Sequence, residues 1–164
     1  MGSRYMVAIS KLIYKLSFKI YNIRAWLIKH SFHSCGKGFK AWGIFSIKNP
    51  DKLTVGNYVS INDFVYINAK GGVSIGNDVA LSVGCKIIST SLDYNNIGPN
   101  KIHIDKEIII GNKVQIGAGA IILPGVTIGN NVVVGAGSVV TESIGNNTIV
   151  AGVPARKIRD LNNE

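Results

Sequence analysis

The chain has 164 residues, 46% hydrophobic and only 16% charged, with 19 glycines and a formal net charge of +9. This length suits one domain with a sizeable apolar core, and the hydrophobic content excludes a disordered chain. The positive charge belongs to residues 1–50, which contain no Asp or Glu; no groove-reading helix or aromatic platform accompanies it, so we expect no nucleic-acid binding.

Residues 5–30 have the periodicity of an amphipathic helix. Lys11, Lys15 and Lys19 recur every four residues on one face, and the other face is aliphatic: Ile9, Leu12, Ile13, Leu16, Ile20, Ile23 and Leu27. Two interpretations of this basic segment, residues 1–40, stay open. The helix packs against the rest of the fold with its lysines in solvent, or it rests peripherally on an anionic membrane surface. The regularly spaced charges exclude a secretory signal and a membrane-spanning helix.

A period of six begins at Val55 and continues to Val140. Aliphatic residues occupy the first position of each repeat: Val55, Ile61, Ile67, Ile75, Leu81, Ile87, Ile110, Ile116, Ile122, Ile128, Val134 and Val140. A small or branched residue follows four positions later in most repeats: Val59, Val65, Val79, Cys85, Val114, Ala120, Val126, Val132 and Ser138. So long a repeat is the signature of a solenoid.

A six-residue repeat predicts one short strand followed by a corner, with three repeats in each turn of a triangular coil. The sequence therefore predicts an all-β fold, a left-handed parallel β-helix of hexapeptide repeats over residues 41–152. Its aliphatic residues stack in the interior. We expect corner residues such as Gly56 and Asn57 to supply unusual backbone dihedrals.

The coil is interrupted between Ile87 and Ile110 by a polar excursion loop, residues 91–107. An insertion in so economical a repeat is more often functional than idle. Residues 153–164 form a tail in which Pro154 ends the coil, and we expect a short C-terminal helix there. No metal site is expected, because His30 and His33 lie outside the repeats and His103 is alone in the loop.

Residues 108–159 resemble the hexapeptide-repeat acetyltransferases, and the segments VVGAGSVVT and AGVPARKIR are similar to the sugar O-acetyltransferase branch. The resemblance implies a homotrimer with sites between subunits, acetyl-CoA as co-substrate and a sugar or polysaccharide acceptor. We therefore expect an acetyl-CoA-dependent O-acetyltransferase acting on a bacterial surface polysaccharide or its precursor. Its expected location is the cytoplasm or the inner membrane surface.

The same resemblance implies cofactor-binding residues. Ala118 and Ala136 match small residues that contact the pantetheine arm, with Gly117 and Gly135 beside them and Thr141 following. Arg156 and Arg159 match the positions that hold the 3′-phosphate of CoA, a task that suits guanidinium groups. Glu142 stands where the family commonly has Lys, which would weaken the attraction for phosphate.

The family's general base is a His in the excursion loop, and Leu92 occupies that position here. One interpretation is that His103 acts as the base, oriented by Asp93 or Asp105. Another is catalysis by proximity and backbone donors alone. The third is a catalytically impaired trimer that binds CoA or a sugar. An amino-sugar N-acetyltransferase also stays open, because the coil does not encode the acceptor.

Overall fold

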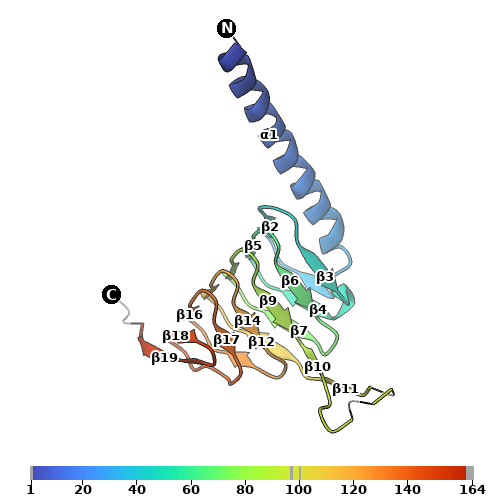
Figure 1. The fold of residues 1–164 in the computed structure, drawn as a ribbon, viewed down its shortest axis with the longest axis vertical. Helices are drawn as coiled ribbons and strands as arrows, with labels where there is room; N and C mark the ends of the chain where they lie inside the picture. Colours follow the sequence, from blue (N-terminus) through green and yellow to red (C-terminus); the bar gives the residue numbers. More distant parts are fainter. Residues whose placement is uncertain (1, 97, 100, 162–164) are drawn as a thin grey trace.

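The structure is a computed structural model that describes residues 2–96, 98–99 and 101–161. A long helix, α1 (Gly2–Lys29), is followed by a parallel β-helix that occupies most of the chain. Figure 1 shows α1 projecting from the N-terminal end of the coil, with the C-terminal strands at the opposite end.

Each turn of the coil contributes one short strand to each of three parallel sheets. The first sheet contains β1 (Ser34–Cys35), β4 (Leu53–Val55), β7 (Val73–Ile75), β12 (Ile108–Ile110) and β15 (Thr127–Ile128). The second contains β2 (Lys40–Ala41), β5 (Ser60–Ile61), β8 (Ala80–Leu81), β13 (Val114–Ile116), β16 (Val132–Val134) and β18 (Thr148–Gly152). The third contains β3 (Ser46–Lys48), β6 (Tyr66–Asn68), β9 (Lys86–Ile88), β14 (Ile121–Ile122) and β17 (Val139–Val140).

The hydrophobic core confirms the predicted repeat. Every first-position aliphatic residue from Val55 to Val140 is buried, and so are the residues four positions later, including Cys85 and Ser138. The strands pair in register from turn to turn, so that Ile110 lies between Ile75 and Ile128. The coil begins at Ser34, earlier than the expected residue 41, because β1 pairs with β4. A short 3-10 helix (Pro50–Lys52) lies between β3 and β4.

The corner glycines have a different role from the one expected. Positive φ angles occur one residue after each corner asparagine, as at Tyr58 and Asp78, and not at Gly56. Gly56 is required by close packing, since a Cβ there would lie 2.6 Å from the carbonyl oxygen of Gly76. The neighbouring Asn57 donates from its backbone N–H and its side-chain amide to Oδ1 of Asn77, at 2.8 and 2.9 Å. The corner is thus a ladder of stacked residues.

The C-terminal part of α1 packs on the coil, but not through its aliphatic face. Leu12 and Leu16 are exposed, whereas Ala25, on the other side of the helix, is buried. Arg24 joins the C-terminal part of α1 to the coil by donating to the carbonyl oxygen of Phe45 at 2.8 Å. A helical period shows which residues share a face, but the contact depends on how the chain leaves the helix.

The expected C-terminal helix is also wrong. Residues Ala155–Asp160 form a strand, β19, that pairs antiparallel with β18. The last strand of a coil has an open edge of unpaired backbone groups, and a returning strand satisfies them. This tertiary gain outweighs the helical propensity of the tail.

Candidate functional site

The excursion loop forms a hairpin that leaves the coil after the third sheet and returns to the first. Its strands are β10 (Thr90–Leu92) and β11 (His103–Asp105), which pair antiparallel. The hairpin has a fixed base. Ser89 is fully buried, its hydroxyl donates to the carbonyl oxygen of Asn68 at 2.8 Å, and its carbonyl accepts from the backbone N–H of Lys106 at 2.9 Å.

The pairing register places His103 directly opposite Leu92. Opposed residues of an antiparallel pair point to the same face, with Cβ atoms roughly 4.5–5.5 Å apart. The imidazole therefore lies across the hairpin from the position at which the family resemblance expects its histidine. The side chain of His103 is exposed, and that of Leu92 is half-buried.

Asp105 shares this face with His103, because the two residues are separated by one position on β11. The pKa of the Asp105 carboxyl lies below its usual value, mainly because of the Thr90 hydroxyl beside it. Lys70, whose Nζ is 3.5 Å from Oδ2 of Asp105, lowers it further, and His103 adds a smaller electrostatic effect. Asp105 is thus the carboxylate that the strand geometry puts on the side of His103.

Asp93 has other partners. Its Oδ1 accepts from the backbone N–H of Asn95 at 3.0 Å, and its Oδ2 accepts from the Asn96 amide at 2.6 Å. These bonds, that of Asn96 first, hold the pKa of the Asp93 carboxyl below its usual value. The arrangement is that of a turn-forming aspartate. Among the described residues, the Asp93 carboxylate therefore bonds to Asn95 and Asn96 of its own turn and not to His103.

A cavity of about 380 Å³ lies between the hairpin and the corner that joins the third sheet to the first. Its lining residues include Leu92, Asp93, Ile104, Lys106, Pro124 and Thr141. Among the described residues that line it, Leu92 is present and His103 is not. In one chain, Leu92 therefore borders this cavity, while the side chain of His103 on the same face is exposed to solvent.

The predicted pantetheine contacts lie at another corner, between the second and third sheets. Ala118 and Ala136 stack in consecutive turns, and the N–H of Gly137 donates to the carbonyl oxygen of Ala118 at 2.8 Å. Gly117 allows this stacking, because a Cβ there would lie 2.6 Å from the backbone nitrogen of Ala136. At Gly135 a Cβ would lie 2.8 Å from the Cβ of Ala151. Close packing of turns thus explains both glycines.

Arg156 and Arg159 both lie on β19, and a β-bulge at Ile149/Val150 determines their side. Arg156 pairs with Ala151 and Arg159 pairs with Ile149. Since Ile149 and Ala151 alternate with the buried Val150, both arginines lie on one outward face. Without the bulge, residues three apart on a strand would lie on opposite faces.

Both guanidinium groups are exposed, and Arg156 Nη1 lies 3.5 Å from Oε1 of Glu142. A second cavity, of about 410 Å³, lies beside this pair and is also lined by Lys157 and Asp160. Glu142 therefore competes directly with any anion for Arg156, as the sequence comparison with the family suggested.

The structure leaves the predicted residues in separate places on one chain. The third sheet lies between the Ala118–Ala136 corner and the corner that holds the hairpin and Thr141. The arginines occupy the C-terminal end of the coil.

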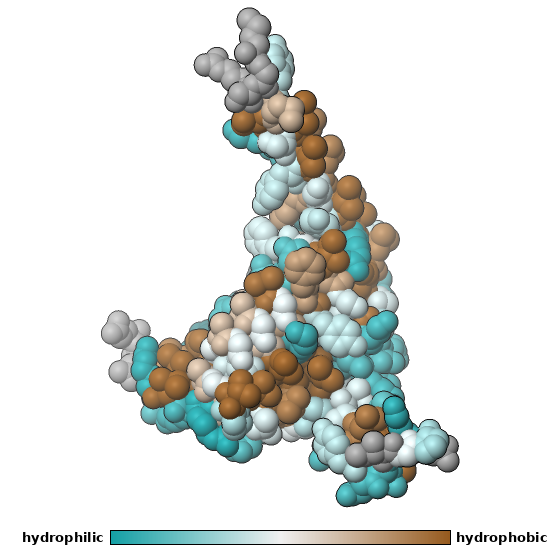
Figure 2. Space-filling view, viewed as in Figure 1, coloured by the Kyte–Doolittle hydropathy of each residue, from teal (hydrophilic) through white to brown (hydrophobic). Residues whose placement is uncertain are grey.

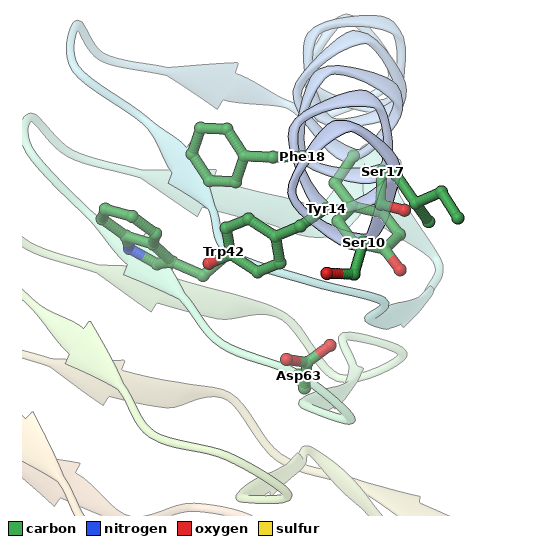
Figure 3. A pocket seen from close by; sticks show the side chains of 8 residues that line it. Ser10, Tyr14, Ser17, Phe18, Trp42 and Asp63 are labelled. Carbon is green, nitrogen blue, oxygen red and sulfur yellow. The ribbon is translucent and has the colours of Figure 1, made fainter. Parts of the chain in front are cut away.

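A third cavity, of about 480 Å³, was not predicted; it lies between α1 and the first turns of the coil. Figure 3 shows Ser10, Tyr14, Ser17 and Phe18 of the helix around it, with Trp42 and Asp63 from the coil. Asp63 is held by the backbone N–H of Ile44, which donates to its Oδ1 at 3.0 Å. The signal in the sequence was the row of aromatic and hydroxyl residues opposite the aliphatic face of the helix.

The profile of the family described as bacterial transferase hexapeptide (six repeats) matches residues 107–142. Galactoside O-acetyltransferase of Escherichia coli K12 is 33% identical over 148 residues, which cover 85% of this chain and 69% of that protein. A dTDP-4-amino-4,6-dideoxy-D-glucose acyltransferase of Escherichia coli is 30% identical, and the alignment covers 79% of this chain and 82% of that protein. Two further relatives are aligned over 59% and 47% of their lengths, so the chain spans about half of each.

Among solved structures, galactoside acetyltransferase in complex with coenzyme A has a TM-score of 0.82 at 29% identity. This likeness covers 99% of this chain and 86% of that chain. A hexapeptide-repeat acetyltransferase from Vibrio cholerae, complexed with acetyl coenzyme A, has a TM-score of 0.80 at 27% identity, covering 99% and 92%. The shared architecture confirms the predicted left-handed parallel β-helix.

Proposed function

The chain belongs to the hexapeptide-repeat acetyltransferases, and from that premise we propose that it is an acetyl-CoA-dependent O-acetyltransferase. Its proposed acceptor is a hydroxyl group on a sugar of a bacterial surface polysaccharide or of its precursor. The observation that carries the proposal is the placement of His103, which faces Leu92 across a hairpin with a fixed base.

The proposed reaction is a direct transfer. The neutral imidazole of His103 accepts the proton of the sugar hydroxyl, and the resulting alkoxide attacks the thioester carbonyl of acetyl-CoA. Backbone N–H groups stabilise the oxyanion of the tetrahedral intermediate. When this collapses, the C–S bond breaks, the proton passes to the CoA thiolate, and the acetyl ester remains on the sugar. Asp105 is the better candidate than Asp93 for orienting the imidazole.

The cofactor-binding residues support the same function. Arg156 and Arg159 share an outward face, which suits a single phosphate group. Ala118 and Ala136 have no long side chains and offer a wall along which a narrow chain such as pantetheine can lie. Gly117 and Gly135 belong to the proposal as neighbours of these alanines, whereas Thr141 lies at the hairpin corner and would join them in the assembled site.

We further propose that the protein is a homotrimer whose sites lie between subunits. The separation of the hairpin from the Ala118–Ala136 corner on one chain supports it, because the corner of one subunit would have to meet the hairpin of the next. In such an assembly His103, which is exposed in one chain, would face the pantetheine wall of a neighbour.

A second candidate function is a trimer that binds CoA or a sugar without turnover. Leu92 favours it, because a leucine cannot accept a proton and it is Leu92 that lines the hairpin cavity. The amino-sugar acyltransferase relative keeps N-acetylation as a further alternative.

Mass-spectrometric detection of acetyl transfer separates these candidates. The full chain is incubated with acetyl-CoA and matched panels of neutral sugars and amino sugars. The proposed function predicts an O-acetyl ester, which is cleaved by mild alkali. An alkali-stable amide would assign N-acetylation, and binding of CoA without any product would assign the non-catalytic alternative.

The location of the acceptor is a separate proposal. In the part of the chain that the structure describes, no helix is long and apolar enough to cross a bilayer. The proposed location is the cytoplasm, with a peripheral contact of α1 at the inner membrane surface.

A further inference from the structure

One side of α1 carries an aliphatic row that is largely exposed, with Ile13 at the border of the cavity between α1 and the coil. We call this row the α1 stripe; it consists of Ile9, Leu12, Ile13, Leu16, Ile20, Ile23 and Leu27, each between 51% and 61% exposed. These positions follow one another at intervals of three and four, so they form one continuous face. Figure 2 shows apolar residues along the edge of the projecting helix.

The opposite side of α1 faces the coil. The ring of Phe18 lies 5.6 Å from that of Trp42, between centroids, and Ala25 is 3% exposed. Tyr14 and Tyr21 line the cavity between the helix and the coil. These contacts fix the rotation of the helix, and the α1 stripe therefore points away from the rest of the fold. Exposed apolar surfaces of this extent mark interaction sites.

The charges beside the stripe indicate the chemistry of the partner. Lys15 and Lys19 lie one helical turn from Leu12 and Leu16, along one border of the stripe, and Lys11 continues their row. No Asp or Glu occurs in residues 1–50, and the ion pairs among the described residues include none of these lysines. Trp26, which is 57% exposed, adds an aromatic group of the kind enriched at membrane interfaces.

We propose that α1 docks the protein on an anionic lipid surface. The α1 stripe enters the boundary between headgroups and acyl chains, and Lys11, Lys15 and Lys19 contact the lipid phosphates. This inference goes beyond acetyl transfer and does not depend on it.

Charge complementarity favours lipid over a second copy of the chain as the occupant. Two α1 helices joined through their stripes would bring their lysine rows close together, and neither would supply an acidic residue. The coil of a second copy offers no excess of acid either, because the basic and acidic residues after position 50 balance. An anionic lipid surface offers acyl chains to the α1 stripe and phosphate groups to the lysines.

Density-gradient flotation of the full chain tests the proposal. The vesicles contain phosphatidylcholine alone or phosphatidylcholine mixed with phosphatidylglycerol. The chain is expected to float with the mixed vesicles, and less with the neutral ones or at high salt. Replacing Lys11, Lys15 and Lys19 by Gln should weaken the partition coefficient by about fivefold for each lysine removed.

A double variant, Leu12→Asp and Leu16→Asp, tests the stripe itself. It should abolish flotation, while a charge-matched control on the coil, Gln115→Asp with Thr127→Asp, should float like the unmodified chain. Light scattering is recorded on the same samples. An unmodified chain that stays unbound with anionic vesicles overturns the proposal. If, in addition, light scattering gives the stripe variant a smaller oligomeric mass than the unmodified chain, the stripe binds a second copy of the chain. If the stripe variant floats as well as the unmodified chain, the α1 stripe is not the lipid-binding surface.

Discussion

Leu92 and His103 are paired directly across the β10–β11 hairpin, so the exposed histidine shares a face with the leucine. The hairpin therefore retains an imidazole close to the expected catalytic position, although the sequence supplies it from the other strand. The packing of the coil, the arginine pair and the hairpin each lead to a prediction.

Gly76 and Gly145 occupy equivalent corners with different neighbours. A Cβ on Gly76 would lie 2.6 Å from the carbonyl oxygen of Gly111, whereas one on Gly145 would have no atom within 4 Å. We expect Gly76→Ala to lower the free energy of unfolding by about 1–3 kcal/mol, the usual cost of overpacking. Gly145→Ala is the matched control and should change it by less than about 0.5 kcal/mol. Urea denaturation measures both, and equal losses would contradict the stacking argument.

Removing either Arg156 or Arg159 should weaken acetyl-CoA binding. Each replacement by Ala is expected to raise KM for acetyl-CoA about tenfold or more, the effect of losing a hydrogen bond to a charged group, with little change in kcat. Lys48→Ala is the charge-matched control, since this exposed lysine lies on β3, in the first turn of the coil.

Acetyl-dephospho-CoA, which lacks the 3′-phosphate, identifies the group that the arginines bind. The unmodified protein should lose affinity for this analogue, and the arginine variants should not distinguish it from acetyl-CoA. Variants that still prefer the phosphorylated form as strongly as the unmodified protein would place the phosphate elsewhere.

Asp105 should make the hairpin sensitive to acid. Its pKa is lowered in the folded state by the Thr90 hydroxyl and by Lys70, so its ionised form stabilises the fold. This contribution is present above the unfolded pKa of about 3.9 and is lost as the pH falls through the lower folded value. Thermal unfolding should therefore show Asp105→Asn below the unmodified protein at neutral pH, with a gap that narrows below about pH 4. A gap that does not depend on pH would refute this.

The sequence predicted the coil well because a six-residue period is a local rule that every turn repeats. The buried positions of Ile61, Leu81 and Ile116 follow directly from it. The role of Gly56 was misassigned because its constraint comes from the carbonyl of Gly76, in the next turn. The tail became β19 because β18 offers an open edge, which no local pattern reveals.

The candidate site was predictable only in part. The length of the excursion indicated an insertion, but the pairing of Leu92 with His103 depends on the register of two strands. The common face of Arg156 and Arg159 depends on a bulge that the residue spacing alone would not suggest. The cavity at Trp42 depends on the rotation of α1, which the helical period leaves undetermined.

The most direct test of the account measures kcat for acetyl transfer in the unmodified protein, His103→Ala, Leu92→His and the double variant. We expect His103→Ala to lower kcat by about 10²–10⁴, the usual contribution of a general base. We expect the double variant to recover much of this loss, because a histidine at position 92 lies on the same face of the hairpin as His103. An unchanged kcat in His103→Ala would contradict the assignment of His103 as the base.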